Sequence, residues 1–422
     1  MLAFEKSLIP KFFRIRQSFD AEELTDIEKA VSEGMAGYME RIKAGGRIGV
    51  AAGSRGIYQY ARIVKAVIDQ VRAAGADPVI IPAMGSHGEG TPEGQAALLD
   101  SYNITEETMG VPLMTSMETV ILGYTPDGMP VHFGKDALGL DGIILVNRVK
   151  PHTDFHGPIE SGVVKQTVVG LGKHNGALAV HRRGVYGLKN NIPEAAAIII
   201  DKAPILMGVA ILENAFDHTS RIEVIPAEDM IEREQALLPE AKSLMPSLPF
   251  KKLDVLVLQE MGKNISGTGM DPNIVGRYLI RNVPDRDPDI YRIVCLDLRA
   301  ECHGNAMGVG IADVITKRLY DKIDFGPTYV NAVTAGFLER VFVPLVAEND
   351  REALEIALNS CNRFVTEADA RVVFARNTLE IADLLVSEAL LPEIENRKDI
   401  EIIGKIELEW QSDGALRSHF VN

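Results

Sequence analysis

The feature that most restricts the fold is an alternation of short apolar runs with longer stretches of helical periodicity. Residues 47–53 (RIGVAAG), 78–83 (PVIIPA) and 141–149 (DGIILVNRV) each have the pattern of a buried strand. Between the first two, residues 57–75 (IYQYARIVKAVIDQVRAAG) carry apolar side chains at helical spacing and end in glycine. A strand, a helix and a second strand of these lengths form a βαβ unit, so the sequence predicts an α/β fold with a parallel sheet.

The same pattern starts again after a stretch with three prolines, residues 237–252. Further strands are expected at 253–262, 291–298, 371–375 and 399–410, with a helix at 310–323. We therefore expect two α/β domains with mixed or parallel sheets and an active-site cleft between them. Residues 1–250 would form the first domain and 251–422 the second, although residues 399–422 could return to the first.

Two local patterns complete the expected framework. Residues 12–19 (FFRIRQSF) alternate as in an exposed edge strand, and Asp20 is expected to cap the charged helix pattern that follows. Residues 119–134 carry Pro-Asp-Gly between two β-like runs, which predicts a hairpin.

Composition limits the class of protein. A hydrophobic content of 46% and a charged content of 24% are typical of a folded globular chain. The formal charge of −15 argues against nucleic-acid binding, which needs basic clusters. Charged residues interrupt every apolar stretch near the start, so we expect no signal peptide. No window approaches about 18 uncharged apolar residues, so we expect no membrane span. The three cysteines lack CxxC spacing and indicate reduced thiols in a cytoplasmic protein. The sequence leaves open whether the protein forms a homo-oligomer.

Polar loops follow the predicted strands at the edge where α/β proteins bind ligands. After the first strand come Ser54, Arg55 and Gly56 at the start of a helix, a pattern that suits a phosphate or carboxylate, although an ordinary capped helix fits equally well. After the second strand His87 lies among glycines, which favours a cleft over a core position.

Residues 149–184, directly after the third strand, hold four of the nine histidines. They are His152, His156, His174 and His181, with Lys165 among them. His87 and His152 follow neighbouring strands, so they could face each other across a small substrate. Two imidazoles near their ordinary pKa of about 6.5 can exchange acid and base roles near neutrality. His174 and His181 would share a helical face, a spacing that more often reflects packing than chemistry.

The second predicted domain contributes a glycine-rich loop, residues 259–277, which includes Lys263. Its glycines match neither GxGxxG at a strand-to-helix turn nor GxxxxGK[ST], so a dinucleotide site or a P-loop is disfavoured. A second polar loop with His303 is equally compatible with cleft lining and with plain surface.

These loops, in this order, resemble the nickel-pincer-dependent lactate racemase family. The resemblance is carried by GSHG at 85–88, KPHTDFHG at 150–157 and SGVVK at 161–165. A histidine sixteen positions after the lysine of the last motif, His181, fits the family spacing. The resemblance implies an isomerase, a racemase or epimerase of a small anionic 2-hydroxy acid.

The resemblance also implies a cofactor, a pyridinium-3,5-bisthiocarboxylic acid mononucleotide that holds nickel, and a role for each matching residue. Lys165 would anchor one arm of the nucleotide, covalently in the best-known member of the family, and His181 would be the protein ligand to nickel. His87 and His152 would be the acid–base pair that moves the proton of the 2-hydroxyl group while hydride leaves C2. Ser54, Arg55 and Lys263 would contact the cofactor or substrate.

The chain also departs from the family pattern. The spacing from His152 to Lys165 is longer than in the lactate enzyme, His156 is additional, and Trp410 is the only tryptophan. Lys173 and His174 are an alternative anchor and ligand. At the level of function, a hydroxy-acid oxidoreductase or dehydratase with another nucleotide stays an alternative, as does a non-catalytic protein that binds small acids.

Overall fold

A computed structural model describes residues 9–54, 56–361 and 365–417. The chain divides into two compact units. Asp20–Met245 form one, here called the N-terminal unit, and Met1–Phe19 together with Pro246–Asn422 form the other, here called the C-terminal unit. None of the helices in the described part of the chain is long and apolar enough to cross a membrane.

The N-terminal unit contains a five-stranded sheet of order β3-β2-β6-β7-β8. The first four strands are parallel and β8 runs antiparallel to β7. In register, Val50 of β2 lies opposite Ile80 of β3 on one side and Ile144 of β6 on the other. The strands are β2 (Arg47–Ala52), β3 (Asp77–Pro82), β6 (Gly142–Arg148), β7 (Ile205–Glu213) and β8 (Thr219–Pro226).

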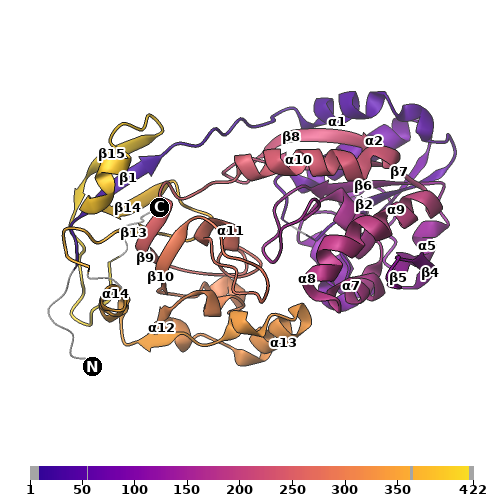
Figure 1. Ribbon diagram of the computed structural model, residues 1–422. Helices are drawn as coiled ribbons and strands as arrows, with labels where there is room; N and C mark the ends of the chain where they lie inside the picture. The colour runs from indigo at the N-terminus through magenta and orange to yellow at the C-terminus, as the bar shows by residue number, and fades with distance from the viewer. Residues whose placement is uncertain (1–8, 55, 362–364, 418–422) are drawn as a thin grey trace. The chain divides into compact units, whose positions relative to one another are not determined.

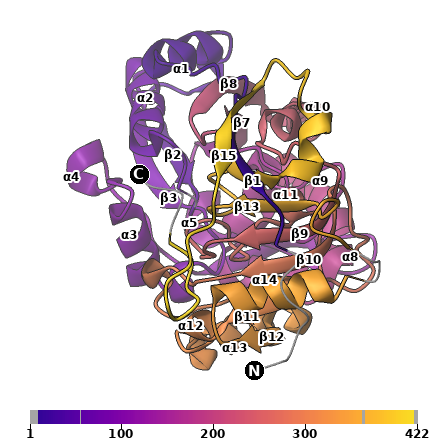
Figure 2. The same ribbon diagram turned by 90° about the vertical axis from the view of Figure 1, so that its left-hand side faces the viewer.

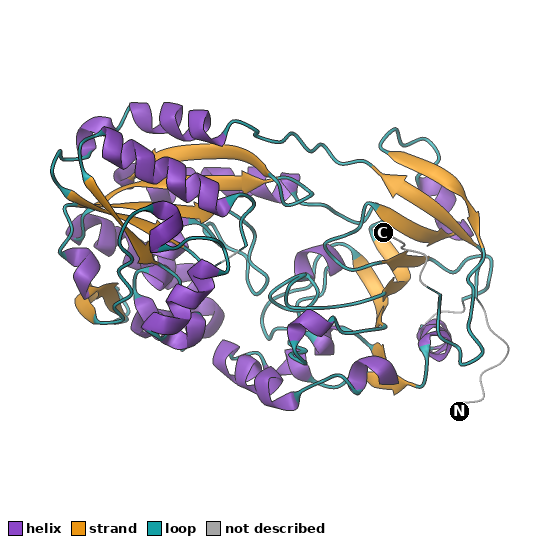
Figure 3. Ribbon diagram, turned by 180° about the vertical axis from the view of Figure 1, so that it is seen from behind, coloured by secondary structure: helices purple, strands orange, loops and turns teal. Residues whose placement is uncertain are grey.

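Helices cover both faces of this sheet (Figure 3). Successive side chains of a strand point to opposite faces, so a strand with apolar side chains throughout must be covered on both. Ile143 and Leu145 of β6 belong to one apolar cluster, whereas Ile144 and Val146 belong to the other. The main helices are α1 (Ile27–Ala36), α2 (Tyr60–Ala73), α3 (Pro92–Asp100), α4 (Glu106–Met109), α5 (Lys135–Leu138), α6 (Val163–Lys165), α7 (Lys173–His181), α8 (Gly184–Tyr186), α9 (Ile192–Lys202) and α10 (Met230–Leu244).

Most local expectations for this unit are confirmed. The helix predicted between the first two strands is α2, and the predicted hairpin is formed by β4 (Thr119–Tyr124) and β5 (Pro130–Gly134). The first charged helix starts later than predicted, because Asp26, rather than Asp20, accepts the backbone N–H of Lys29 as the N-cap of α1.

The C-terminal unit contains an eight-stranded mixed sheet of order β12-β11-β10-β9-β13-β14-β1-β15. The five strands from β12 to β13 in this order are parallel, and β14, β1 and β15 pair antiparallel. The elements are β1 (Phe12–Gln17), β9 (Lys252–Leu258), α11 (Pro272–Val275), β10 (Asp289–Cys295), β11 (Val314–Thr316), α12 (Lys317–Tyr320), α13 (Phe325–Ala335), β12 (Leu345–Ala347), α14 (Asp350–Asn359), β13 (Val372–Ala375), β14 (Asp383–Ser387) and β15 (Ile400–Ile406).

The expected edge strand at the start of the chain is instead an interior strand of the C-terminal unit. Figures 1 and 2 show the indigo β1 beside the yellow β15. Ile15 pairs with Leu384 of β14 on one side and with Ile402 of β15 on the other. The division expected at residue 250 therefore differs from the observed one at the amino end, because the hydrogen bonds of β1 are made with strands from the end of the chain.

Another prediction was wrong in part. Residues 310–323, expected as one helix, contain β11 followed by the short α12. Val314 and Ile315 pair with both β10 and β12, so tertiary pairing overrides the helical pattern.

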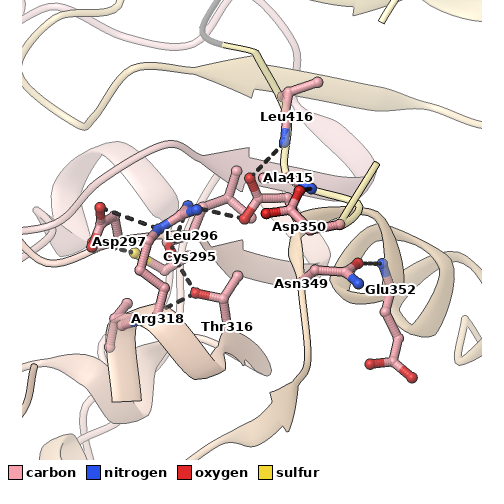
Figure 4. Close-up of polar contacts among 12 residues, drawn as sticks. Cys295, Leu296, Asp297, Thr316, Arg318, Asn349, Asp350, Glu352, Ala415 and Leu416 are labelled. Carbon is pink, nitrogen blue, oxygen red and sulfur yellow. Dashed lines mark hydrogen bonds and ion pairs between the residues drawn. The ribbon is translucent and has the colours of Figure 1, made fainter. Parts of the chain in front are cut away.

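A polar network holds the chain end to the C-terminal unit (Figure 4). The buried carboxylate of Asp350 accepts hydrogen bonds from Arg318 Nη2 at 2.9 Å and from the backbone N–H of Leu416 at 2.8 Å. Burial raises the pKa of Asp350, and the guanidinium of Arg318 opposes that shift. Residues up to 417 thus belong with β15 in this unit and do not return to the N-terminal unit.

Candidate active site

The polar loops predicted from the sequence leave three neighbouring strands of the N-terminal unit. Ser54 follows β2, His87 follows β3 and His152 follows β6. Since β2 lies between β3 and β6 and all three are parallel, their carboxyl ends lie side by side. This edge of an α/β sheet is where ligands bind in proteins of this architecture.

Ser54 and His87 contact each other directly, with Ser54 Oγ 2.5 Å from His87 Nδ1. The contact fixes one ring nitrogen of an imidazole that is otherwise exposed. The loop of His87 is held from behind by Gln95, whose side-chain amide donates to the carbonyl of Gly85 at 2.9 Å. Arg55, the arginine expected beside Ser54, lies outside the described residues.

A helical segment that carries Lys165 crosses these strand ends. Lys165 is the last residue of α6 and is followed by a π-helical turn, η3 (Gln166–Gly170), a geometry often found at functional sites. The side-chain amide of Gln166 donates to the carbonyls of Ala51 in β2 and Val146 in β6, both at 3.1 Å. Gln166 thereby fixes the position of its neighbour Lys165 relative to the sheet.

Lys165 and His152 form the central pair, with Lys165 Nζ 2.6 Å from His152 Nε2. His152 Nδ1 accepts the backbone N–H of Asp154 at 3.1 Å, while the Asp154 carboxylate, at 3.7 Å, is too distant from Nδ1 for a hydrogen bond. The Lys165 amine and the His152 ring are thus joined by one hydrogen bond at this edge of the sheet.

His181 lies at the end of α7, close enough to Lys165 and Asp154 for their charges to act on it. Burial, together with the positive charge of Lys165 and against the Asp154 carboxylate, lowers the pKa of His181 to about 4. The ring is therefore neutral near pH 7, the form that binds a metal. Among the described residues, no group of three or more His, Cys, Asp or Glu could hold a metal ion by itself.

Two carboxyl groups that support this edge were not predicted from the sequence. Glu160 accepts the backbone N–H of His152 at 2.8 Å, and Glu234 of α10 accepts the backbone N–H of Val164 at 2.9 Å. Both are only 1% exposed. A glutamate in the histidine-rich stretch was a usable signal for Glu160, but Glu234 is seventy residues from its partner and has no local signal.

The alternative anchor and ligand are placed differently. Lys173 is 2% exposed and donates to the carbonyl of Pro82 at the end of β3, at 2.7 Å. Burial lowers the pKa of Lys173 to about 8. His174 is exposed at the start of α7. Lys173 is thus bonded to the end of β3, whereas Lys165 is bonded to a histidine.

The predicted residues of the second domain lie in the C-terminal unit. Lys263 donates through Nζ to Asn331 Oδ1 and through its backbone N–H to Cys302 Sγ. His303 has a left-handed backbone conformation, with φ of 47°, in the loop after β10. The assignment of Lys263 to the cofactor stays a prediction.

The fold and this edge together define an α/β protein with a histidine after each of two strands of one sheet, a lysine hydrogen-bonded to one of these histidines and a neutral imidazole nearby. Residues 17–191 match the family model described as the lactate racemase N-terminal domain. The resemblance indicated by the sequence motifs is thereby confirmed.

The structure is also similar to that of the lactate racemase apoprotein from Thermoanaerobacterium thermosaccharolyticum, with a TM-score of 0.56 and 13% sequence identity over 87% of this chain and 94% of that one. This similarity confirms the two-unit α/β fold. A cinnamyl alcohol dehydrogenase from Sorghum bicolor (17% identity, 55% of this chain and 46% of that one) reaches a TM-score of only 0.17, too low to indicate a shared fold. No curated protein matches the sequence.

Proposed function

We propose that the protein is a racemase or epimerase of a 2-hydroxy acid that uses the nickel-pincer pyridinium nucleotide. The family match and the shared fold support a function of the lactate racemase type. The observation that carries the finer proposal is the contact of Lys165 with His152 beside a neutral His181. A general-base histidine alone would not need a lysine hydrogen-bonded to it or a second imidazole that stays neutral.

The residues fit the proposed cofactor. Lys165 would hold one arm of the nucleotide, either by an ion pair with its thiocarboxylate or by a bond in which the amine gives up a proton, attacks the activated thiocarboxyl carbon and displaces the activating group. His181 would ligate nickel, because its buried ring is neutral at cellular pH. When bound, the nucleotide supplies an electrophilic centre that takes hydride from C2 of the substrate and returns it.

The side chains of the protein would transfer the hydroxyl proton and bind the negatively charged groups of the substrate and the nucleotide. Removal of hydride from C2 requires loss of the hydroxyl proton, which an imidazole can accept, whereas the C2–H bond itself is far too weakly acidic for imidazole. His87 and His152 would hold and return that proton, and Ser54 would fix the ring of His87 through Nδ1. Arg55 and Lys263 would bind the carboxylate of the substrate or the phosphate of the nucleotide.

The proposal is tested with protein produced in cells that make the cofactor. Elemental analysis should find nickel, and the mass of the intact protein should reveal whether Lys165 carries the nucleotide. A chiral assay over a panel of 2-hydroxy acids should detect interconversion of enantiomers or epimers. His181→Ala should lose nickel, whereas His174→Ala, a matched change at an exposed histidine of the same helix, should retain it.

Other outcomes favour the alternatives. Protein without nickel and without a bound chromophore would contradict the proposal. Hydrogen isotope exchange at C2 that requires added nicotinamide cofactor would favour an oxidoreductase. Small-acid binding that survives His87→Ala and His152→Ala, without turnover, would favour a non-catalytic binding protein.

A further inference from the structure

Two titratable side chains of helix α10 contact the segments that carry Lys165 and His152. Glu234 and Lys242 are eight residues apart on this helix, so about 12 Å of helix separates them. Glu234 contacts the start of α6, and Lys242 contacts the loop of His152 through Glu160. Neither contact is needed for the proton and hydride chemistry proposed above.

Glu234 caps the segment that presents Lys165. Its carboxyl accepts the N–H groups of Val163 and Val164, and the helical segment presents Lys165 directly after them. The carboxyl occupies space that exists only because residue 162 is glycine, since a Cβ at Gly162 would collide with it. Oε1 of Glu234 has no hydrogen-bond partner among the described residues. A buried carboxyl held in this way is costly, so its placement needs an explanation beyond packing.

Glu160 and Lys242 fix the loop of His152. Lys242 Nζ lies 2.6 Å from Glu160 Oε1, and Oε2 of the same carboxylate accepts the backbone N–H of His152 at 2.8 Å. Oε1 also accepts the backbone N–H of Gly157 and contacts His156 Nδ1 at 3.3 Å. His156, which the family pattern lacks, therefore contacts the carboxylate that holds the loop.

We propose that α10 is the positioning element of the site: through Glu234 and through the Lys242–Glu160 pair it sets the distance between Lys165 and His152. The inference concerns positioning residues and rests on the proposed function for its link to turnover. Its physical basis is that the Lys165–His152 hydrogen bond joins two segments that both contact α10 at their far ends, in addition to the backbone hydrogen bond between Lys150 and Ser161 that links them at their base. A displacement of either segment lengthens that bond, and small misplacements of reacting groups reduce rates strongly.

The test measures Lys165 directly in protein without cofactor or substrate. Wild type is treated with acetic anhydride at pH 7.5, and acetylation of the Lys165 peptide is followed by mass spectrometry. In Glu234→Gln and Gly162→Ala, Lys165 should lose its contact with His152, so the rate of its acetylation should change roughly five- to tenfold. Because both changes act through one contact, the double variant should differ from wild type by no more than the larger single change.

The other half of the proposal is tested at His152. Lys242→Met should change the rate of carbethoxylation of His152 by diethyl pyrocarbonate by a similar factor, and Lys242→Arg, which keeps the charge, should restore it. Glu240→Gln is the matched control, because Glu240 lies on the same helix and pairs with Arg221 on the surface. In loaded enzyme the positioning variants should lower kcat more than they raise KM.

The outcomes separate positioning from stability and from the proposed function. The proposal would be overturned by variants that melt at a lower temperature but in which Lys165 and His152 are labelled at the wild-type rates, since α10 would then only stabilise the fold. If Glu234→Gln fails to fold, Lys242→Met, at a partly exposed position, still decides the question. Wild-type protein without nickel would contradict the proposed function, whereas the labelling rates of the unloaded protein would still support or overturn this one.

Discussion

Replacement of Glu234 by glutamine should remove a defined part of the pH dependence of stability. Glu234 is fully buried, and burial raises its pKa to about 7 from an ordinary value of 4.5, against the opposing hydrogen bonds from Val164 and Val163. The folded state therefore binds a proton at this carboxyl more tightly than the unfolded state. The stabilisation that the proton contributes is complete below pH 4.5, declines as the pH rises from 4.5 to 7, and is lost above pH 7.

The size of the effect follows from the two pKa values. At pH 5 the folded carboxyl is protonated and the unfolded one is mostly ionised, whereas at pH 8 both are ionised. The difference corresponds to about 2 to 3 kcal/mol of unfolding free energy between pH 5 and pH 8. Glutamine does not titrate, so Glu234→Gln should lack this contribution, apart from a pH-independent loss of about 1 kcal/mol for the weakened cap.

Scanning calorimetry of the full chain at pH 5 and pH 8 measures the difference. For a unit of this size, the wild-type transition of the N-terminal unit should shift with pH by roughly 5 to 10 °C more than that of the variant. Glu240→Gln should follow wild type. Equal pH shifts in wild type and Glu234→Gln would refute the reasoning, because they would mean that Glu234 is not a buried carboxyl with a raised pKa.

Four further outcomes are expected. His87→Ala should abolish interconversion of substrate enantiomers while nickel content is retained, and His152→Ala should abolish interconversion as well, measured by chiral assay and elemental analysis. Lys173→Met should remove a rise in stability between about pH 8 and 10, because burial lowers the pKa of Lys173 to about 8 and the unfolded chain binds that proton more tightly; denaturant midpoints at both pH values check this. Asp350→Asn should loosen the chain end at a cost of about 1 to 3 kcal/mol. Trp410, the only tryptophan, bridges to Leu416 and should report that change by fluorescence.

The sequence determined the elements whose signals are local. Periodicity located β2, α2, β3 and β6, because the side chains of a strand buried on both faces must all be apolar. A Pro-Asp-Gly turn located the β4–β5 hairpin, because turn residues favour one backbone geometry. His87 and His152 were recognisable because each lies in a loop directly beside glycine or proline, and Lys165 because it ends the motif SGVVK at 161–165.

The sequence did not reveal contacts between distant segments. β1 alternates like an edge strand, and only its pairing with β14 and β15 makes it an interior strand of the other unit. The helical periodicity of residues 310–323 likewise gave way to the pairing of β11 with two neighbours.

The same division applies to the candidate site. The sequence supplied His152 and Lys165, but the tertiary structure decided that they form a pair and that Glu234 and Lys242 support it from another helix. The physical reason is that a local pattern reports only how a side chain lies on its own element. The protonation state of a lysine or a glutamate is decided by which groups from elsewhere in the chain exclude water from it and hydrogen-bond to it.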